Sequence, residues 1–484
     1  MALNYPKKIL HWIAGKELAT QSEDFFDKYN PATGGVLAKV AKGGKSRVEN
    51  AVLSASQAYE IWSRKSVVER AGVLREAVRI MRDKKEEFAE IIALESGKPK
   101  KISLGEVEAA SACGAFFAEE GAKLFSAREA LPSATPGRKI ELIRRPIGIG
   151  ALITPFNNPA ASIAWKTFPA LLCGNAVVLK SHGYTPYIGI WYAKVFKEAG
   201  LPDGVFNVLQ GRGGEAGAAL VADPRIKFIS FTGSLKTGES ILKAAASRLA
   251  KVSIEAGGKN PFVVCDDADL ERAALVAVAA TFVDAGQRCA AASRIIIFES
   301  IYENFKKLFL EKASKLKVGV EDDCDYGAII SKERTERILM YVSDAIKRGA
   351  KILLGNPVAK PGAGYFIEPI VLEGVKTTDQ IWREEVFGPV VVLAKAKNFE
   401  DALKLANDSD FKLSGAIHTK NMKLAEDFIN RYQSGVVRVN GPTHGSEPNM
   451  PFGGVGMSGN GWREPGSKAL DFYADWQQVS IDHN

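Results

Sequence analysis

The spacing of hydrophobic residues divides the chain into blocks of different secondary structure. Between residues 44 and 126, apolar side chains recur at helical intervals among many Ala, Glu, Lys and Arg residues, as in VVERAGVLREAVRIMRDKKEEFAEIIALES. This spacing predicts a helical region. In the segment 127–146 the pattern changes to short extended runs interrupted by Pro and Gly, which predicts a β-ribbon.

From residue 148 to about 255, strand-like runs alternate with helix-length segments. The predicted strands are GIGALITP, NAVVLKS, VFNVLQG, IKFISFTG and KVSIEAGG. This alternation is typical of right-handed βαβ units in a parallel sheet that is covered on both faces. A second alternating block from about 262 to 440, with strands such as PFVVC, RIIIF and GVVRVN, predicts a second α/β domain.

The fold class that these blocks predict is α/β, with closely packed domains. A chain of 484 residues is too long for one compact core. Neither a solenoid-type repeat nor a low-complexity linker interrupts the sequence, so we expect the domains to pack directly against each other.

Composition and charge are those of an ordinary globular protein. Hydrophobic residues make up 46% of the chain and charged residues 25%. The formal net charge is +8, but Lys and Arg alternate with Asp and Glu along the chain. We therefore expect no nucleic-acid partner, although a modest positive surplus would suit an anionic substrate or cofactor.

Cysteine usage and hydropathy predict the cellular compartment. The five cysteines form no CxxC motif and have no nearby histidine pair, so we expect free thiols in a reducing compartment and no metal site. The N-terminus lacks an apolar core long enough for a signal peptide. The uncharged run 147–165 has the length of a membrane span, but two prolines and two adjacent asparagines favour a buried strand and loop. We expect a cytoplasmic protein without a membrane partner.

Two loops at strand ends of the first α/β block have the composition of a phosphate site and a ribose site. In TGSLKTG, Gly233 and Gly238 bracket a strand-to-helix turn, where backbone N–H groups and the Ser234 hydroxyl could meet a phosphate. In KSHGYTP, residues 180–182 follow another strand of the same sheet, where open α/β sheets bind ligands. An ordinary glycine turn and a solvated loop are the alternatives for each stretch taken alone.

Two further residues have the chemistry of a base and a nucleophile. Glu255 ends a predicted strand, and a carboxyl group that faces an apolar cleft has the raised pKa of a general base. A surface ion pair is its alternative. Cys289 lies in AGQRCAAA, where small neighbours leave the thiol accessible and a cation or turn amides could lower its pKa. Most lone cysteines are inert core residues, so the other motifs must decide whether Cys289 is a nucleophile.

Seven motifs, in order along nearly the whole chain, resemble those of the aldehyde dehydrogenase superfamily. They are ITPFNNP at 153–159, KSHGYTP at 180–186, FTGSLKTG, IEAGGKNP, AGQRCAAASR, EEVFGPV at 384–390 and NMPFGGVGMSGNGWRE at 449–464. The resemblance implies a Rossmann-like parallel-sheet cofactor domain, an α/β catalytic domain and a small β oligomerisation ribbon.

The resemblance also implies a role for each catalytic residue. Cys289 would attack the aldehyde carbonyl to give a thiohemiacetal, and hydride transfer to the nicotinamide would leave a thioester. The side-chain amide of Asn157 and the backbone N–H of Cys289 would hold the oxyanion, each donor contributing about 3 to 4 kcal/mol. Glu255 would activate the water that hydrolyses the thioester, and Lys166 corresponds to a family lysine that relays protons.

A binding site for NADP or NAD follows from the same resemblance. Lys180 would hold the adenosine ribose, Gly233 and Ser234 the pyrophosphate, and Glu385 the nicotinamide ribose, while Phe387 would pack near the ring. The other residues that the resemblance places at the cofactor are Ile153, Thr154, Pro155, Phe156, Ser181, His182, Gly183, Gly213, Gly217, Phe231, Thr237 and Ala256.

One departure from the family pattern bears on cofactor choice. Three residues after the ribose lysine, where NAD-preferring members commonly carry a glutamate, this chain has Gly183. The missing carboxylate would bind ribose hydroxyls and repel a 2′-phosphate. We therefore expect that NADP is accepted. The usual LGG after the general base is AGG here, a change too small to affect catalysis.

The substrate is expected to be a small polar or anionic semialdehyde. Trp165 stands where some semialdehyde oxidisers carry an arginine, but the loop GPTHGSEPN at 441–449 is small and polar. The residues expected at the substrate are Trp165, Arg288, Thr443, His444, Ser446 and Phe452. An ordinary exposed loop histidine is an equally good interpretation of His444. The C-terminal sequence is similar in style to that of oxidisers of α-ketoglutarate semialdehyde.

The resemblance implies domain bounds and an assembly. Residues 1–126 and 147–257 would form the cofactor domain, 258–457 the catalytic domain, and 127–146 with 470–484 the oligomerisation elements. The last two would leave an open strand edge on a monomer, so we expect a homodimer or homotetramer.

Two other functions fit the same fold. Acyl transfer to coenzyme A is disfavoured by Glu255, because acylating relatives usually lack that carboxylate. A crystallin-like binding protein without turnover is disfavoured because the cysteine, glutamate and asparagine are all intact.

Overall fold

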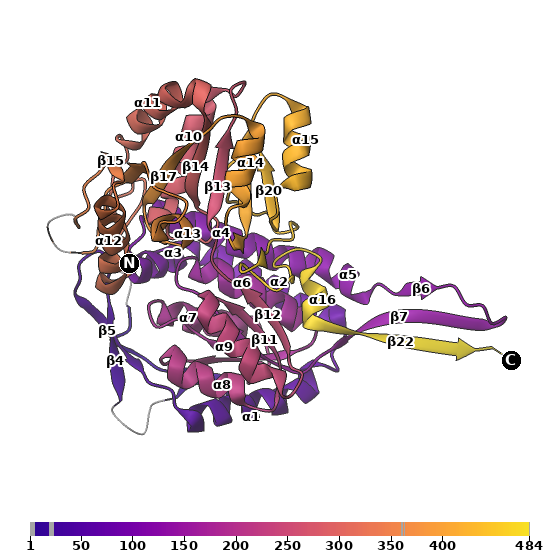
Figure 1. The fold of residues 1–484 in the computed structure, drawn as a ribbon. Coiled ribbons are helices and arrows are strands. Elements are labelled where there is room, and N and C mark those ends of the chain that lie inside the picture. Colours follow the sequence, from indigo (N-terminus) through magenta and orange to yellow (C-terminus); the bar gives the residue numbers. More distant parts are fainter. Residues whose placement is uncertain (1–4, 19–23, 360–361, 363, 484) are drawn as a thin grey trace.

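The structure consists of two α/β bodies, each built on a seven-stranded sheet, and a β-ribbon that projects from one side (Figure 1). This computed structural model describes residues 5–18, 24–359, 362 and 364–483. The α/β class predicted from the sequence is confirmed. The cavity described below is lined by residues of both bodies.

The first sheet has the strand order β12-β11-β8-β9-β10-β2-β3. Its strands are β2 (His11–Ile13), β3 (Lys16–Leu18), β8 (Ile149–Ile153), β9 (Ala176–Lys180), β10 (Phe206–Leu209), β11 (Ile226–Thr232) and β12 (Lys251–Glu255). Strands β8 to β12 are parallel, as the alternating pattern predicted. The hairpin of β2 and β3 adds an antiparallel edge next to β10.

Helices between these strands cover the sheet. They are α6 (Pro159–Leu172), α7 (Pro186–Glu198), the short π-helix η2 (Gly213–Gly217) with α8 (Ala218–Ala222), and α9 (Leu235–Ala246). All five residues of β9 are buried, which is why its first four residues are continuously apolar instead of alternating.

The predicted helical region before the ribbon packs on the same sheet. Its helices are α1 (Lys45–Trp62), α2 (Val67–Asp83), α3 (Lys85–Ser96), α4 (Lys100–Phe116), η1 (Phe117–Gly121) and α5 (Ala122–Ser126). Ser66 and Glu69 form a capping box that starts α2, and Gly97, with a φ of 72°, ends α3. Helix α4 packs against α6, so the α3–α4 junction lies beside the start of α6.

The second sheet has the order β15-β16-β17-β14-β13-β19-β20, with only the edge strand β15 antiparallel to its neighbour among the described pairs. Its strands are β13 (Asn260–Val264), β14 (Ala292–Phe298), β15 (Lys351–Leu354), β16 (Ile370–Glu373), β17 (Val390–Ala396), β19 (Ser414–His418) and β20 (Val436–Val439). Its helices are α10 (Leu270–Phe282), η3 (Val283–Gly286), η4 (Glu299–Ile301), α11 (Tyr302–Ala313), α12 (Lys332–Lys347), α13 (Gln380–Arg383), α14 (Phe399–Asn407) and α15 (Met422–Arg431).

Smaller elements complete the molecule. A three-stranded sheet holds β1 (Lys8–Ile9), β5 (Val36–Ala41) and β4 (Phe25–Tyr29), and a two-stranded sheet pairs β18 (Phe411–Lys412) with β21 (Val455–Gly456). Beyond β21 the chain returns to the first sheet, where Glu255 forms an isolated antiparallel bridge with Gly459. Helix α16 (Ala469–Tyr473) then leads into the last strand.

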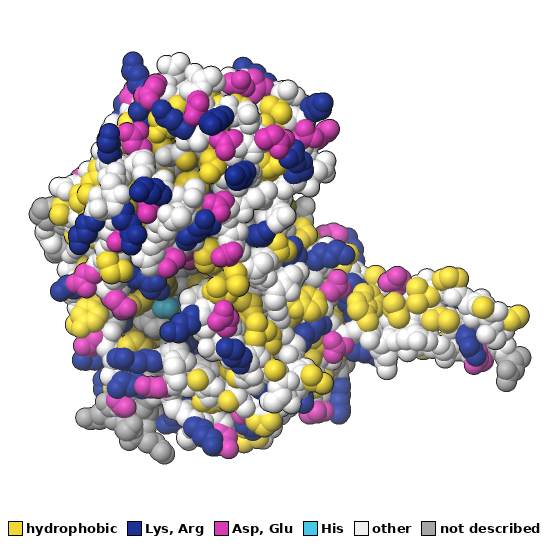
Figure 2. Space-filling view, viewed as in Figure 1, with side chains coloured by type: hydrophobic (Ala, Val, Ile, Leu, Met, Phe, Trp, Pro, Cys, Tyr) yellow, Lys and Arg dark blue, Asp and Glu magenta, His cyan; other side chains and the backbone are white. Residues whose placement is uncertain are grey.

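The projecting ribbon joins three antiparallel strands in the order β22-β7-β6. They are β6 (Glu129–Leu131), β7 (Arg138–Pro146) and β22 (Ala474–Asp482), so the ribbon predicted over 127–146 pairs with the C-terminal strand. Hydrophobic side chains gather along its visible face (Figure 2). Within the described residues, no helix is long and apolar enough to span a membrane.

Candidate active site

A cavity of about 350 Å³ brings the four predicted catalytic residues together: Asn157, Lys166, Glu255 and Cys289 all line it. Asn157 follows β8, and Glu255 is the last residue of β12. The cavity therefore opens at the carboxyl ends of the parallel strands, where open α/β sheets place their ligands. Cys289 reaches it from the other α/β body.

Cys289 lies in a turn between η3 and β14, in an unusual backbone conformation. The preceding residues Asp284, Ala285 and Gly286 have φ angles of 52°, 56° and 65°. A side chain at Gly286 would bring its Cβ to 2.2 Å from the carbonyl oxygen of Gly388, so only glycine fits there. This left-handed stretch turns the chain sharply before the thiol.

Two buried side chains hold the backbone of the cysteine turn. The amide nitrogen of Asn260 donates to the carbonyls of Cys289 and Ala291, each at 2.8 Å. The hydroxyl of Thr443 donates to the carbonyl of Ala290 at 2.7 Å. The expectation that Thr443 contacts the substrate is therefore corrected: it is 1% exposed and supports the turn from behind.

The thiol of Cys289 is protonated at neutral pH in this structure. Burial raises its pKa to about 12, and the negative charges of Glu385 and Glu255 act in the same direction, while Arg288 opposes them. Since the thiolate is the nucleophile, this thiol needs a base or a change of its surroundings before it attacks.

Asn157 presents a free amide to the cavity. It lies one residue before Asn158, the residue that precedes the first turn of α6. Its side chain is buried, at 8% exposure, and makes no hydrogen bond with any described part of the chain. A donor held at the rigid start of a helix and not yet paired suits the stabilisation of a developing oxyanion.

Glu255 is held by the C-terminal segment that crosses β12. Its Oε2 accepts a hydrogen bond of 3.1 Å from the backbone N–H of Gly454, and the neighbouring N–H of Ala256 donates to the carbonyl of Ser458 at 2.8 Å. Burial and the negative charge of Glu464 raise the pKa of Glu255 well above its ordinary value. A carboxyl group in this state has the character of a general base.

Lys166 forms a fully buried ion pair beside Glu255. Its ammonium lies 2.7 Å from Oε2 of Glu464 and 2.8 Å from the hydroxyl of Ser230. The second oxygen of Glu464 accepts hydrogen bonds from Ser230 at 2.6 Å and Tyr473 at 2.9 Å. Every charge in this group is therefore compensated, as burial requires.

The start of α9 has the features of a pyrophosphate site. Ser234 precedes the helix in an extended conformation, and no side chain caps the first turn. The hydroxyls of Ser234 and Thr237 are exposed and lie 2.9 Å apart. A Cβ at Gly233 would lie 2.5 Å from the ring of Phe231. Unpaired N–H groups at a helix start favour a bound phosphate.

The loop after β9 is positively charged. Burial lowers the pKa of Lys180 to about 8, and its ammonium donates to the carbonyl of Ser181 at 2.7 Å. Burial, followed by the charges of Lys180, Arg334 and Lys28, lowers the pKa of His182 to about 3. His182 is thus neutral at neutral pH, and the positive charges of Lys180, Arg334 and Lys28 contribute to this.

Glu385 and Phe387, both predicted at the cofactor, come from the second body and lie beside residues that follow β12 and β8 of the first sheet. Glu385 accepts a hydrogen bond of 2.9 Å from the backbone N–H of Gly258, and a Cβ at Gly257 would lie 2.2 Å from its carboxylate. Burial raises the pKa of Glu385 to about 7. Phe387 packs edge-on against Phe156, with ring centroids 5.7 Å apart. The glycine pair after Glu255 thus leaves room for the carboxylate.

The other residues predicted at the cofactor are distributed around this edge. Ile153, Thr154, Pro155 and Phe156 end or follow β8, Phe231 lies in β11, Ala256 follows β12, and Gly183 lies in the loop after β9. Gly213 and Gly217 form the ends of η2, where an added Cβ would meet open space. The structure therefore gives no steric reason for glycine at those two positions.

Five of the six residues predicted at the substrate line the cavity. Trp165 and Phe452 form an apolar wall, with ring centroids 5.8 Å apart. Arg288, His444 and Ser446 form a polar part. Nη1 of Arg288 lies 3.5 Å from Nδ1 of His444, and burial with the charge of Arg288 lowers the pKa of this histidine to about 4. The polar part therefore carries one cation and a neutral imidazole.

Sequence reasoning missed several polar residues of the site. They are Lys98, Glu106, Asn260, Asp284 and Glu464. Glu464 stands inside a quoted motif, but the motif indicated no role for it. Asn260 also stands inside a quoted motif, IEAGGKNP, that indicated no role for it. Lys98 lies between α3 and α4, Glu106 inside α4 and Asp284 in η3, and none of the three has a local signal. Among the described residues, no group of three or more His, Cys, Asp or Glu side chains could hold a metal ion.

Comparison with known proteins gives consistent matches over nearly the whole chain. The family model described as the aldehyde dehydrogenase family matches residues 18–479. A 2,5-dioxopentanoate dehydrogenase of Saccharolobus solfataricus is 37% identical over 466 residues, covering 95% of this chain and 97% of its own length. An alpha-ketoglutaric semialdehyde dehydrogenase of Bacillus subtilis is 35% identical and covers 98% of both chains.

A solved structure matches just as completely. The crystal structure described as an NADP dependent enzyme of Escherichia coli superposes with a TM-score of 0.95, at 32% identity and over 98% of each chain. The cavity residues and these similarities point to the same family.

Proposed function

This chain belongs to the aldehyde dehydrogenase family and is an oxidoreductase, and we propose that it oxidises a small semialdehyde with an anionic tail to the free acid. One observation carries the proposal: a single cavity holds Cys289, Asn157 and Glu255 together with the cationic side chain of Arg288. The names of both sequence relatives fit such a substrate, because 2,5-dioxopentanoate and α-ketoglutaric semialdehyde are one compound, with a carboxylate at the end opposite to the aldehyde.

The proposed chemistry starts at sulfur. Cys289 gives its thiol proton to Glu255, which passes it to solvent, and the sulfur attacks the aldehyde carbonyl carbon to form a thiohemiacetal. The amide of Asn157 and the backbone N–H of Cys289 stabilise the negative charge that develops on the oxygen. Each such donor contributes about 3 to 4 kcal/mol when it is held in place beforehand.

Release of the product is assigned to Glu255. Once the carbon bound to sulfur has been oxidised, the enzyme carries a thioester. Glu255 takes a proton from a water molecule, which attacks the thioester and frees the acid and the thiol. The Gly454 N–H fixes one carboxylate oxygen of Glu255, and the other oxygen has no hydrogen-bond partner among the described residues, so it is available to accept the proton.

The residues at the sheet edge fit a nicotinamide dinucleotide, which supplies a hydride acceptor when bound. The uncapped start of α9 and Ser234 would hold the pyrophosphate, Lys180 the adenosine ribose and Glu385 the nicotinamide ribose. The cations near His182 favour a further phosphate on the adenosine ribose, and Gly183 carries no carboxylate to repel it. We therefore propose that NADP is accepted. One similar solved structure is described as an NADP dependent enzyme, and another as a complex with NAD+.

The assembly is proposed to be a homo-oligomer in the reducing cytoplasm. The ribbon of β6, β7 and β22 projects from the protomer with apolar side chains along its visible face (Figure 2), and its two outer strands, β6 and β22, pair only with β7 among the described residues. All five cysteines are free thiols, which fits a reducing compartment.

A panel of aldehydes tests the proposed function. Reduced cofactor is followed at 340 nm with NAD and with NADP, using 2,5-dioxopentanoate, succinate semialdehyde, butanal and benzaldehyde. We expect kcat/KM to be at least tenfold higher for the two carboxylate-bearing aldehydes than for butanal. Equal or higher values for butanal would refute the anionic substrate, and a requirement for coenzyme A would refute hydrolytic release.

A further inference from the structure

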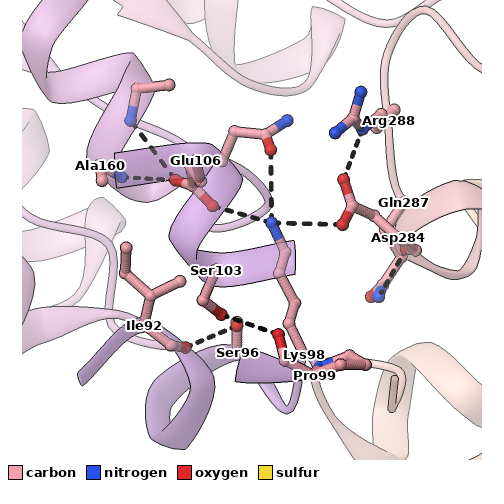
Figure 3. Close-up of polar contacts among 12 residues, drawn as sticks. Ile92, Ser96, Lys98, Pro99, Ser103, Glu106, Ala160, Asp284, Gln287 and Arg288 are labelled. Atoms are coloured by element: carbon pink, nitrogen blue, oxygen red, sulfur yellow. Dashed lines mark hydrogen bonds and ion pairs between the residues drawn. The ribbon is translucent and has the colours of Figure 1, made fainter. Parts of the chain in front are cut away.

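Lys98 lies at the centre of a buried polar network on one wall of the cavity. It follows Gly97 at the junction of α3 and α4, and it is 6% exposed. Figure 3 shows its ammonium reaching two acidic side chains from different parts of the chain. It lies 2.9 Å from Oε2 of Glu106 and 3.6 Å from Oδ1 of Asp284, and it donates to Oδ1 of Asn158 at 3.3 Å. Asn158 and Asp284 belong to different α/β bodies.

One side of this network fixes the start of α6. The second oxygen of Glu106 accepts hydrogen bonds from the backbone N–H groups of Ala160, at 2.8 Å, and Ala161, at 3.4 Å. A carboxylate at this position satisfies N–H groups that the helix cannot satisfy itself and stabilises the helix dipole. Asn157, which offers its amide to the oxyanion, directly precedes this capped helix start.

The other side fixes the turn that carries the nucleophile. Asp284 is the first of the three left-handed residues before Cys289, and its second oxygen pairs with Nε of Arg288. Burial alone would raise the pKa of Asp284, but the charges of Arg288 and Lys98 lower it to about 2. Asp284 is therefore an anion at neutral pH, and Lys98 compensates part of its charge.

We propose that Lys98 is a positioning residue that sets the placement of Asn157 relative to Cys289. The two donors assigned to the oxyanion, the Asn157 amide and the Cys289 backbone N–H, stand on separate bodies. Lys98 contacts Glu106, which caps the helix start beside Asn157, and Asp284, which lies in the turn that carries Cys289. A misplacement of about 1 Å at a reacting centre costs about 10²-fold in rate. A residue that fixes both donors relative to each other therefore affects the rate. The inference rests on the proposed roles of Asn157 and Cys289, and it does not depend on which aldehyde is the substrate.

Lys98→Met tests this role, with Lys98→Arg as the conservative variant and Lys100→Met as a matched control on the surface. Stopped-flow formation of reduced cofactor is measured with 2,5-dioxopentanoate and with butanal, and cofactor affinity by fluorescence titration. We expect Lys98→Met to slow the first turnover 10- to 100-fold for both aldehydes, with cofactor affinity unchanged. Lys98→Arg should recover the rate to within about fivefold, and Lys100→Met should match the wild type.

A double-mutant cycle separates positioning from a merely structural role. If Lys98 acts through Asn157, then Lys98→Met should cost less than threefold in an Asn157→Ala background. A full loss in that background would overturn the proposal. So would a rise of KM for 2,5-dioxopentanoate alone, because Lys98 would then contact the substrate tail directly.

A milder variant keeps the test decisive if Lys98→Met does not fold. Asn158→Ala removes one contact of Lys98 and retains both ion pairs, and it is measured in the same cycle. A loss of about three- to tenfold that disappears in the Asn157→Ala background supports the proposal, and an additive loss, or none, refutes it. Failure of the proposed function looks different: the Asn157→Ala parent would then be fully active, or the wild type inactive with every aldehyde.

Discussion

The carboxylate of Glu255 accepts one hydrogen bond, of 3.1 Å, from the backbone N–H of Gly454. Its other oxygen is buried without a hydrogen-bond partner among the described residues. Burial and the charge of Glu464 raise the pKa of Glu255 well above its usual range. The candidate base is therefore protonated under conditions in which an exposed glutamate would be ionised, and this determines how its reaction depends on pH.

Hydrolysis of the thioester is expected to accelerate with rising pH. Only deprotonated Glu255 can accept a proton from water, and its raised pKa moves the onset of this form to higher pH. Glu255→Gln should lower steady-state turnover by about 10²- to 10³-fold while a burst of reduced cofactor persists, and the rise with pH should disappear. Rapid-quench detection of the acyl-enzyme checks both points. A variant with wild-type turnover and an unchanged pH profile would contradict the assignment of the base.

Alkylation of Cys289 is expected to be slow at neutral pH and to rise steeply above it. Since the pKa of the thiol is about 12, each pH unit between 7 and 9 should raise the thiolate fraction, and hence the rate with iodoacetamide, about tenfold. Cys324 is the other cysteine that is not buried, so the measurement uses a Cys324→Ser background. Cys289→Ser should remove the labelled peptide and abolish turnover. A rate that is flat below pH 9 would indicate a thiolate already formed.

Local sequence patterns were sufficient to predict the site residues at the carboxyl ends of the parallel strands. Glu255 and Lys180 end parallel strands and Asn157 follows one, and a run of apolar residues bounded by glycine or proline marks such strands clearly. Cys289 is different: on its own it is one small residue among alanines. Its prediction depended on the resemblance of several motifs in family order.

The supporting residues could not be predicted because their partners are set by tertiary packing. Lys166 and Glu464 pair across 298 positions of sequence, and Lys98 meets Asp284 from the opposite α/β body. Thr443 was expected at the substrate because threonine in a polar loop looks exposed, yet its hydroxyl satisfies a buried carbonyl. Periodicity and motif spacing carry no information on such contacts.

Gly183→Glu is expected to disfavour NADP relative to NAD. An added Cβ at this position would lie 3.4 Å from the ring of Phe26, which is close to ordinary contact, so the side chain can be accommodated. The new carboxylate would repel a 2′-phosphate and could accept hydrogen bonds from ribose hydroxyls. We expect kcat/KM with NADP to fall at least tenfold while that with NAD is kept or rises. Gly183→Gln, of similar size without charge, is the control, and an equal effect of both variants would indicate steric exclusion instead.

Arg288→Gln is expected to weaken binding of the anionic tail selectively. Nε of Arg288 pairs with Asp284, but its Nη2 makes no hydrogen bond among the described residues, and the side chain lines the cavity. A charge-assisted hydrogen bond contributes about 1.5 to 3 kcal/mol, so KM for 2,5-dioxopentanoate should rise about 10- to 150-fold, with the constants for butanal little changed. Ser446→Ala, in the same cavity, controls for loss of a neutral contact. The single variant also leaves the negative charge of Asp284 with less compensating positive charge. It is therefore compared with the double variant Asp284→Asn/Arg288→Gln, in which that negative charge is removed. Equal losses for both aldehydes in both variants would show that Arg288 supports the cysteine turn and does not bind the substrate.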